Sequence, residues 1–279
     1  MLFKSKILKT LLPVFAAGLV LSSCQKMDRP ALGDYPKDAN PPGGPLKFFA
    51  AMDGGNVDSI RANFGIDNNA SFVSTGVNGG AAQLDGSKNG FISYPSANDF
   101  GVSKDFTISF WINITLAQKD NSHAVGVLAF ANTANFWGNA TFYADNTTKG
   151  PSDSMDLKIH FNAPGNTDDW NFANYTGTAR WPHMYDGVWH QIAFTYSAAD
   201  STGTVYRDGV QFDQKTSQSI AFENSSQVIV GGYQEAAGIS SSYADQTWMA
   251  GFPGMIDNVR LYGVALAPSD IATLYANKQ

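Results

Sequence analysis

The chain contains a single cysteine, Cys24, in 279 residues. An intramolecular disulfide and a cysteine-rich metal site are therefore excluded. Glutamate is almost as rare, because only Glu223 and Glu235 stand beside 22 aspartates. Basic residues are few and do not cluster, and the net charge is negative, so the sequence predicts no nucleic-acid binding. No apolar run approaches the roughly 20 residues that a membrane-spanning helix needs.

The longest apolar run, residues 11–21, follows three lysines and precedes Ser22, Ser23 and Cys24. A basic start, a short apolar stretch and small residues are typical of an export signal. The segment around Cys24 resembles the bacterial lipobox, which implies that residues 1–23 are a signal peptide and that Cys24 carries the lipid. Two or three acyl chains would give a stable anchor. The alternative is an ordinary secretory signal with an incidental cysteine.

The rest of the chain divides into a linker and one large body. Residues 24–46 hold five prolines with glycines between them and no apolar periodicity, which predicts a semi-rigid tether. Residues 47–279 show no second linker and suit a single domain. Without residues 1–23 the chain loses three of its 18 Lys and Arg and keeps 24 Asp and Glu, so its net charge becomes −9.

Apolar periodicity within the body predicts an all-β domain. Residues 105–115 alternate strictly, with Phe106, Ile108 and the next three alternate residues on one face. Residues 155–161, 188–196 and 227–230 are also predicted strands, and residues 203–212 a hairpin with an Asp208–Gly209 turn. Only the tail is predicted as a helix, because Pro268 and Asp270 precede an apolar stripe of Ile271, Leu274 and Tyr275.

Five motifs occur in an order that resembles a known family. They are Ala82–Ser87, Phe106–Ile112, Trp189–Tyr196, Val205–Val210 and Phe252–Tyr262. Together they resemble the LamG-like jelly-roll domain of the concanavalin A-like lectin and glucanase superfamily. The resemblance implies a two-sheet antiparallel sandwich with a short C-terminal helix. It also implies glycan binding as the commonest role, although the fold alone does not decide between a lectin, a hydrolase and an adhesion module.

The sequence predicts a protein that is not an enzyme. Retaining glycosidases need two carboxylates about 5 Å apart, and the hydrolases of the resembled superfamily carry theirs on one strand. Glu223 and Glu235 are isolated, and no nucleophile elbow or zinc motif is present. Asp156, Lys158 and His160 alternate outward on one strand. They form either a polar ligand groove or, the more favoured interpretation, a solvated sheet face.

Candidate ligand-binding residues lie in the segment 132–186, which mixes aromatic and polar side chains. Sugars stack on aromatic faces and bond their hydroxyls to a few well-placed polar groups. Three tryptophans stand beside Asn, Asp, Gly or Pro and are predicted in loops: Trp137, Trp170 and Trp181. The predicted polar partners are Asp168, Asp169, Asn171 and Arg180. The alternative for each tryptophan is a plug over the edge of the sandwich. Tyr243 and Trp248 form a separate candidate rim.

A structural calcium ion is a further expectation that the resemblance implies. Calcium prefers several oxygen ligands, usually carboxylates with backbone carbonyls. Asp257 alternates to the face opposite Ile256 and is predicted to meet Asp53 or Asp58 near the start of the domain. The alternative is that Asp257 only anchors backbone N–H groups.

The resulting hypothesis is an outer-membrane lipoprotein with one jelly-roll domain that binds an extracellular oligo- or polysaccharide. It would be lipid-anchored, facing the cell surface or the periplasm, and would act beside outer-membrane glycan-uptake proteins. An adhesion or structural module that binds another protein is the first alternative. A divergent glycoside hydrolase that uses two aspartates is the second.

Overall fold

The computed structural model describes residues 44–134, 136–145, 152–163, 166–171, 180–216, 219–223, 227–239 and 247–279. Contacts divide the chain into Met1–Pro41 and Pro42–Gln279, and every described residue belongs to the second unit. The predicted signal peptide, the predicted lipid-attachment residue Cys24 and nearly all of the predicted tether therefore lie outside the described residues. Within the described part of the chain, no helix is long and apolar enough to cross a bilayer.

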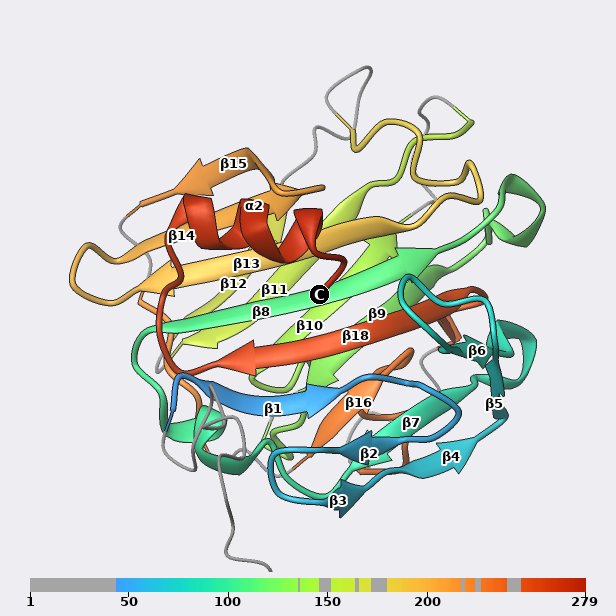
Figure 1. Cartoon of the computed structure of the whole chain (residues 1–279), viewed down its shortest axis with the longest axis horizontal. Helices are drawn as coiled ribbons and strands as arrows, with labels where there is room; N and C mark the ends of the chain where they lie inside the picture. Colours follow the sequence, from blue (N-terminus) through green and yellow to red (C-terminus); the bar gives the residue numbers. More distant parts are fainter. Residues whose placement is uncertain are drawn as a thin grey trace, which may run out of the picture. The chain divides into compact units, whose positions relative to one another are not determined.

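Two sheets form the sandwich (Figure 1). The ten-stranded sheet has the order β15 (Val210–Lys215), β14 (Thr202–Arg207), β13 (His190–Ser197), β8 (Phe106–Asn113), β18 (Met255–Tyr262), β1 (Leu46–Ala50), β2 (Val57–Asp58) and β3 (Asn63–Phe64), with β6 (Ala81–Leu84) beside β18 and β5 (Ala70–Val73) beside β6. The eight-stranded sheet has the order β12 (Asn166–Asn171), β11 (Leu157–Ala163), β10 (Ala140–Asp145), β9 (Ala124–Phe130), β16 (Val228–Val230), β7 (Phe91–Tyr94) and β4 (Ile66–Asn68), with β17 (Met249–Gly251) parallel to β9. This is the expected jelly-roll sandwich.

The core lies between the two sheets and follows the alternation in the sequence. In β8, Phe106 and the alternate residues after it belong to one buried cluster. Leu157, Ile159 and Phe161 of β11 face them from the other sheet. Phe161 lies between Phe142 and Phe194, with ring centroids 6.3 and 4.8 Å away. The predicted inward faces of both strands are therefore confirmed.

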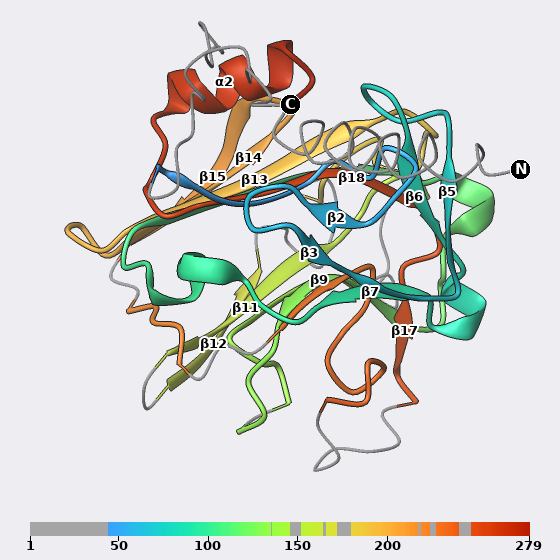
Figure 2. The ribbon, with the colours of Figure 1, turned by 60° about the horizontal axis from the view of Figure 1, so that its bottom comes forward.

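Short helices close the ends of the sandwich. The 3₁₀ helices are η1 (Gly86–Lys88), η2 (Asn98–Val102) and η3 (Leu116–Gln118). The predicted C-terminal helix is present as α2 (Pro268–Ala276), and Asp270 accepts a hydrogen bond from the Ala267 N–H at 3.2 Å. Figure 2 shows α2 on the outside of the ten-stranded sheet. Its Ile271 and Leu274 pack there in a second cluster with Tyr206 and Tyr262.

The predicted β14–β15 hairpin is confirmed with its turn. Asp208 and Gly209 have φ values of 51° and 77°, the positive pair that a type I′ turn requires. The Asp208 carboxylate accepts a hydrogen bond from the Gln191 N–H at 3.0 Å and lies 2.9 Å from Nδ1 of His190. Nε2 of the same imidazole is 3.3 Å from the Asp186 carboxylate. His190 and the Asp208 carboxylate thus tie the β14–β15 turn to the start of β13.

Candidate functional site

The outer face of the eight-stranded sheet carries a group of aromatic side chains, which we call the aromatic platform. Its members are Phe136, Trp137, Tyr143, His160 and Trp248. Tyr143 and His160 project from β10 and β11 on the face away from the core. Phe136 and Trp137 come from the β9–β10 loop, and Trp248 directly precedes β17. Two loops far apart in sequence therefore meet over one sheet.

Trp137 lies flat on the sheet. Its ring is stacked on Tyr143 and on His160, with centroid distances of 4.9 and 4.8 Å and interplanar angles of 24° and 22°. Because both partners belong to the sheet, the opposite face of the indole points away from it. Trp248 meets this indole edge-on at 5.6 Å and is 42% exposed. Trp137 itself remains partly exposed, so the platform presents aromatic surface to a ligand.

A buried amide holds the two loops together. Gln234, 1% exposed, donates to the Phe136 carbonyl at 2.8 Å and accepts from the Asn132 N–H at 3.0 Å. Gly138 has a φ of 70°, and a Cβ there would lie 2.4 Å from the Phe130 carbonyl oxygen. Glycine is thus required directly after Trp137. Thr141 Oγ1 donates to the Trp137 carbonyl at 2.6 Å, which fixes the backbone of that tryptophan.

Charged side chains continue the face beside the platform. Lys158 Nζ is 2.8 Å from the Asp145 carboxylate and 5.9 Å from the centre of the Tyr143 ring. Both partners of this ion pair are largely buried. The expectation that the outward residues of this strand are solvated is wrong, because Asp156, Lys158 and His160 are all buried. Trp137 covers His160 directly.

A carboxyl with a raised pKa lies on the second platform loop. Glu235 follows Gln234, and burial raises the pKa of its side chain to about 7. Both carboxylate oxygens of Glu235 are buried, and burial outweighs the hydrogen bonds from the Gln234 side chain and the Glu235 backbone, which lower the pKa. Burial also raises the pKa of Tyr233, and the Glu235 charge adds to this increase. The neutral carboxylic acid is therefore the favoured form of Glu235 below neutral pH.

The structure separates the three predicted loop tryptophans. Trp137 does lie in a loop and forms the centre of the platform. Trp181 is 0% exposed and stacks on Phe212 with 4.4 Å between ring centroids, so it is a core plug, and its predicted ligand contact is wrong. Trp170 lies in β12 rather than in a loop, opposite the core residue Ile159. The prediction of a loop there is also wrong.

The predicted polar partners are likewise dispersed. Arg180 is 2% exposed and one guanidinium nitrogen is 3.4 Å from the Asp145 carbonyl oxygen, so it is a buried residue rather than a surface ligand. Asp168, Asp169 and Asn171 lie in β12, where the backbones of Asp169 and Asn171 pair with His160 and Lys158. The side chains of these β12 residues lie outside the described part of the structure, as does Tyr243.

The three predicted metal ligands do not form one cluster. Asp58 accepts hydrogen bonds from the Phe49 and Ile60 N–H groups and from Asn98, so its carboxylate is occupied by the fold. Asp257 accepts from the Val77 N–H at 2.7 Å, and Asp53 accepts from the Gly80 N–H at 2.6 Å. These two carboxylates therefore hold opposite ends of one loop. Among the described residues, no group of three or more metal-ligating side chains is found.

Asp257 has a raised pKa, and burial is the main cause. It raises the pKa of this carboxyl to about 6, and the negative charge of Asp53 contributes to the increase. Oδ1 of Asp257 is buried without a hydrogen-bond partner. The sequence predicted that Asp257 meets Asp53 or Asp58. The effect of the Asp53 charge on Asp257 agrees with Asp53 as the partner, and Asp58 does not belong to the pair.

Several residues of the platform were outside the sequence-based prediction. Trp248 was assigned to a separate rim, but it belongs to the same platform as Trp137. Gln234 and the half-buried Phe136 carried no signal in the sequence, because loop-to-loop contacts leave no periodic pattern. The aromatic content of residues 132–186 pointed to the correct region, and the pairing of β10 with β11 then determines which rings meet.

Comparisons with known proteins agree with this architecture. A family model described as the concanavalin A-like lectin/glucanases superfamily matches residues 85–272. The binding domain of Paraclostridial Mosquitocidal Protein 1 superposes with a TM-score of 0.62 at 15% identity, covering 85% of this chain and 53% of that one. Domain 4 of AbnA, a GH43 extracellular arabinanase from Geobacillus stearothermophilus solved in complex with arabinotriose, gives 0.56 at 18% identity, covering 82% and 98%. At these identities the likeness concerns the fold alone.

One curated relative matches over a short stretch. It is the Rattus norvegicus protein named sushi, von Willebrand factor type A, EGF and pentraxin domain-containing protein 1, which is 28% identical over 95 residues. The match covers 33% of this chain and 2% of that protein, so this chain corresponds to a small part of the relative's length.

Proposed function

The chain belongs to the concanavalin A-like lectin/glucanase superfamily, and we propose that it is an exported lipoprotein that binds extracellular carbohydrate without cleaving it. The observation that carries this proposal is the flat stack of Trp137 on Tyr143 and His160, flanked by Trp248. A pyranose or furanose ring offers a C–H-rich face that suits such an indole. The platform is therefore the proposed ligand site.

The way the platform is built also favours ligand binding. Sites for small ligands are usually formed before the ligand arrives and combine apolar walls with a few polar groups. The Gln234 amide fixes both loops, and the Asp145–Lys158 pair adds charge at the margin. Rings held in this way lose little freedom when a sugar stacks on them, which lowers the entropic cost of binding.

A glycan array tests the proposal directly. The intact protein, purified in detergent, is compared with Trp137→Ala and Trp248→Ala, and circular dichroism checks that each variant is folded. We expect about 5- to 150-fold weaker binding in both, because stacking on an aromatic ring contributes about 1–3 kcal/mol. Trp189→Ala, a half-buried tryptophan on the other sheet, is the matched control. If the parent binds no glycan, the proposal is wrong.

A protein-binding role is the second candidate, and one surface favours it. Phe64 and Ile66 are 69% and 68% exposed, and Val57 pairs with Phe64 across β2 and β3. Exposed apolar residues that adjoin one another often mark protein contacts. In a crosslinking experiment on whole cells, Phe64→Ser would abolish a specific crosslinked partner if this role holds, whereas Trp137→Ala would leave it unchanged.

The arrangement of carboxylates supports binding without hydrolysis. Glu235 has the raised pKa that a general acid needs. A retaining glycosidase also needs a carboxylate nucleophile about 5 Å away, and the Asp145 carboxylate beside the platform is engaged with Lys158. We expect no release of reducing ends from any glycan that the protein binds. Release that disappears in Glu235→Gln would instead establish a hydrolase.

A structural calcium ion is a further part of the proposal. The unpartnered Oδ1 of Asp257 and the neighbouring charge of Asp53 fit a cation, because a metal would satisfy the buried oxygen and remove the repulsion. Asp53 and Asp257 would hold the ion, which would stabilise the loop that both residues already bind. Calcium, but not magnesium, is expected to raise the melting temperature, and the rise should vanish in Asp257→Asn. An unchanged melting temperature in calcium contradicts this.

Lipid attachment and location complete the proposal. The lipobox-like segment before Cys24 is the support for an acylated N-terminus. Labelling with radioactive palmitate is expected for the parent and not for Cys24→Ala, and the labelled protein should fractionate with the outer membrane. Protease accessibility in intact cells then distinguishes the cell surface from the periplasmic face. Co-purification with an outer-membrane glycan importer is the expected partner test.

A further inference from the structure

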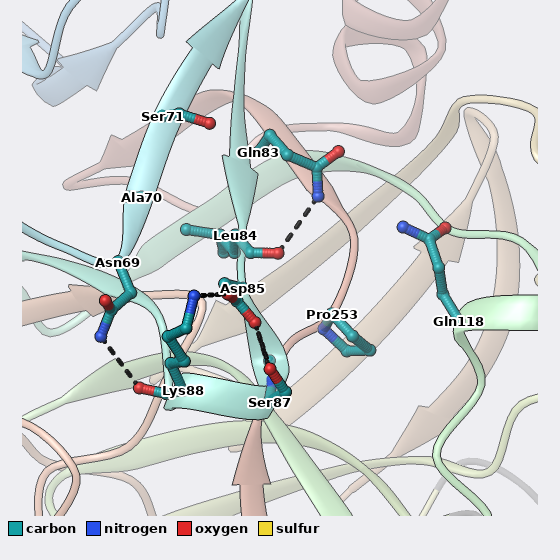
Figure 3. Close-up of a pocket in the computed structure, with 11 residues that line it drawn as sticks. Asn69, Ala70, Ser71, Gln83, Leu84, Asp85, Ser87, Lys88, Gln118 and Pro253 are labelled. Carbon is teal, nitrogen blue, oxygen red and sulfur yellow. Dashed lines mark hydrogen bonds and ion pairs between the residues drawn. The ribbon is translucent and has the colours of Figure 1, made fainter.

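A pocket separate from the aromatic platform opens at the end of the sandwich where β6, η1, η3 and the β17–β18 loop meet. It has a volume of about 530 Å³. Figure 3 shows its polar side chains on opposite sides, with Gln83 and Asn69 across from Gln118. Pro253 supplies apolar surface between them, whereas the Leu84 side chain is 2% exposed and packs in the core. None of these residues belongs to the aromatic platform.

Gln118 presents a hydrogen-bond donor to the pocket. Its Oε1 accepts from both the N–H and the Oγ1 of Thr115, each at 2.9 Å. These two bonds fix which end of the amide is oxygen, so Nε2 is left on the other side. Figure 3 shows that nitrogen directed toward Gln83 and Leu84. The amide is thus oriented before any ligand binds.

Gln83 presents the complementary group. Its Nε2 donates to the Leu84 and Gly254 carbonyl oxygens, each at 3.1 Å, so Oε1 is the end that remains to accept a hydrogen bond. The nearby Asp85 carboxylate forms an ion pair with Lys88 at 2.7 Å and accepts a hydrogen bond from the Ser87 hydroxyl at 2.6 Å. The hydrogen bond from Lys88, foremost among the causes, lowers the pKa of Asp85. The pocket therefore offers a fixed donor and a fixed acceptor without an unbalanced charge.

We propose that this pocket is a second carbohydrate subsite, which binds one neutral sugar unit through a pair of adjacent hydroxyls. A hydroxyl both donates and accepts, so a neighbouring pair can accept from Gln118 Nε2 and donate to Gln83 Oε1. The half-buried Pro253 lies where the C–H face of the ring would rest. A charged sugar fits less well, because the ionised groups of Asp85 and Lys88 already satisfy each other. This inference rests on the proposed carbohydrate binding.

The two sites are close enough to hold one glycan chain. Trp248 of the platform and Pro253 of the pocket stand at opposite ends of β17, five residues apart. Five residues span at most about 18 Å even when fully extended. The Asn89 side chain accepts from the Gly251 N–H at 3.0 Å, which joins β17 to the segment that follows η1. An oligosaccharide of several units would engage both sites, and linked contacts of this kind increase affinity strongly.

The test compares ligands of different length on the intact protein. The probes are arabinan, xylan, mixed-linkage β-glucan and α-mannan, each as polymer and as oligosaccharides from disaccharide to hexasaccharide. Gln118→Glu is the decisive variant, because the new carboxylate still accepts from Thr115 but replaces the donor with an acceptor. We expect about tenfold weaker binding of the longer ligands and unchanged binding of the disaccharide at the platform.

Controls separate this inference from the proposed function. Gln211→Ala changes an exposed glutamine on β15, at the far edge of the ten-stranded sheet, and should leave every affinity unchanged. If Gln118→Glu and the parent bind all lengths equally while Trp137→Ala loses binding, the second subsite is wrong and the platform stands. If the parent binds none of the probes, both proposals fail together. A loss that is equal for every length would also contradict the subsite.

Discussion

The two outer faces of the sandwich are covered in different ways. On the ten-stranded sheet, α2 packs Ile271 and Leu274 against Tyr206 and Tyr262. On the eight-stranded sheet, loops bring Phe136, Trp137 and Trp248 over Tyr143 and His160. The helix buries two aliphatic side chains and stacks Tyr275 on Trp111 with 5.5 Å between ring centroids, whereas the loops leave the aromatic platform partly open.

This difference shows how one fold provides both stability and a binding surface. A helix shares one apolar stripe with a sheet and buries it completely. A loop positions single side chains by hydrogen bonds, so it can support a ring without enclosing it. The amide of Gln234 does this for the platform, because it extends from one loop and forms two hydrogen bonds to the other. Changes on the two faces should therefore affect different properties.

The largest expected effect contrasts a buried and a platform tryptophan. Trp181→Ala removes a fully buried side chain that stacks on Phe212, and should lower the free energy of unfolding by about 3–5 kcal/mol. Trp137→Ala removes a partly exposed ring and should cost about 1–2 kcal/mol, while glycan binding is lost. Urea denaturation measures both. Similar losses of stability in the two variants would remove the distinction between plug and platform.

The conservative variant sharpens this contrast. The indole Nε1 of Trp181 is buried without a hydrogen-bond partner. Trp181→Phe removes that unsatisfied group together with part of the ring, so it should cost clearly less than Trp181→Ala. At Trp137 the same replacement keeps an aromatic face and should retain part of the glycan affinity.

The turn beneath α2 gives the next largest effect. Gly209 has a φ of 77°, and a Cβ there would lie 2.9 Å from Cβ of Tyr275 in α2. Gly209→Ala should therefore lower the free energy of unfolding by about 1–3 kcal/mol, through backbone strain and displacement of the helix. Gly55→Ala, where a Cβ meets no atom within 4 Å, is the control. Glycan affinity should not change in either variant, and a change would show that the two faces are coupled.

The sequence predicted the helix-covered face more completely than the platform. The Asp208–Gly209 turn and the Pro268 helix are local signals, because neighbouring residues determine the backbone there. Trp137 and Trp181 both stand beside glycine, proline or asparagine, yet one is exposed and one is buried. Burial at these positions depends on contacts with Phe212, Met155 and His160, which are distant in sequence. Local composition cannot encode such contacts, so it identified the region and not the ring that binds.

Glu235 should make the platform loop sensitive to pH. Its folded pKa of about 7 lies above the ordinary value of 4.5 for a glutamate side chain. The contribution of Glu235 to the free energy of unfolding is fully present below pH 4.5. It is lost as the pH rises through about 7, since ionisation of the buried carboxyl is unfavourable. Glu235→Gln should remove this loss and raise the unfolding free energy at pH 8 by about 1–2 kcal/mol. Melting temperatures between pH 4 and pH 8 measure it, and parallel curves for both proteins would contradict the assignment.

The smallest expected effect lies on the helix-covered side, at His190. Burial lowers the pKa of this imidazole, but its hydrogen bond to Asp208 and the negative charges of Asp208 and Asp186 raise the pKa overall. A histidine with a raised folded pKa stabilises the fold while it is protonated. That contribution is complete below the unfolded pKa of about 6.5 and disappears as the pH rises through the higher folded value. His190→Gln should therefore lose under about 1 kcal/mol at pH 6 and less at pH 9. His190 holds the turn under α2 and not the platform, so its substitution should change the melting temperature and leave glycan affinity at pH 6 unchanged. An equal loss of stability at pH 6 and pH 9 would exclude a stabilising pair between protonated His190 and Asp208.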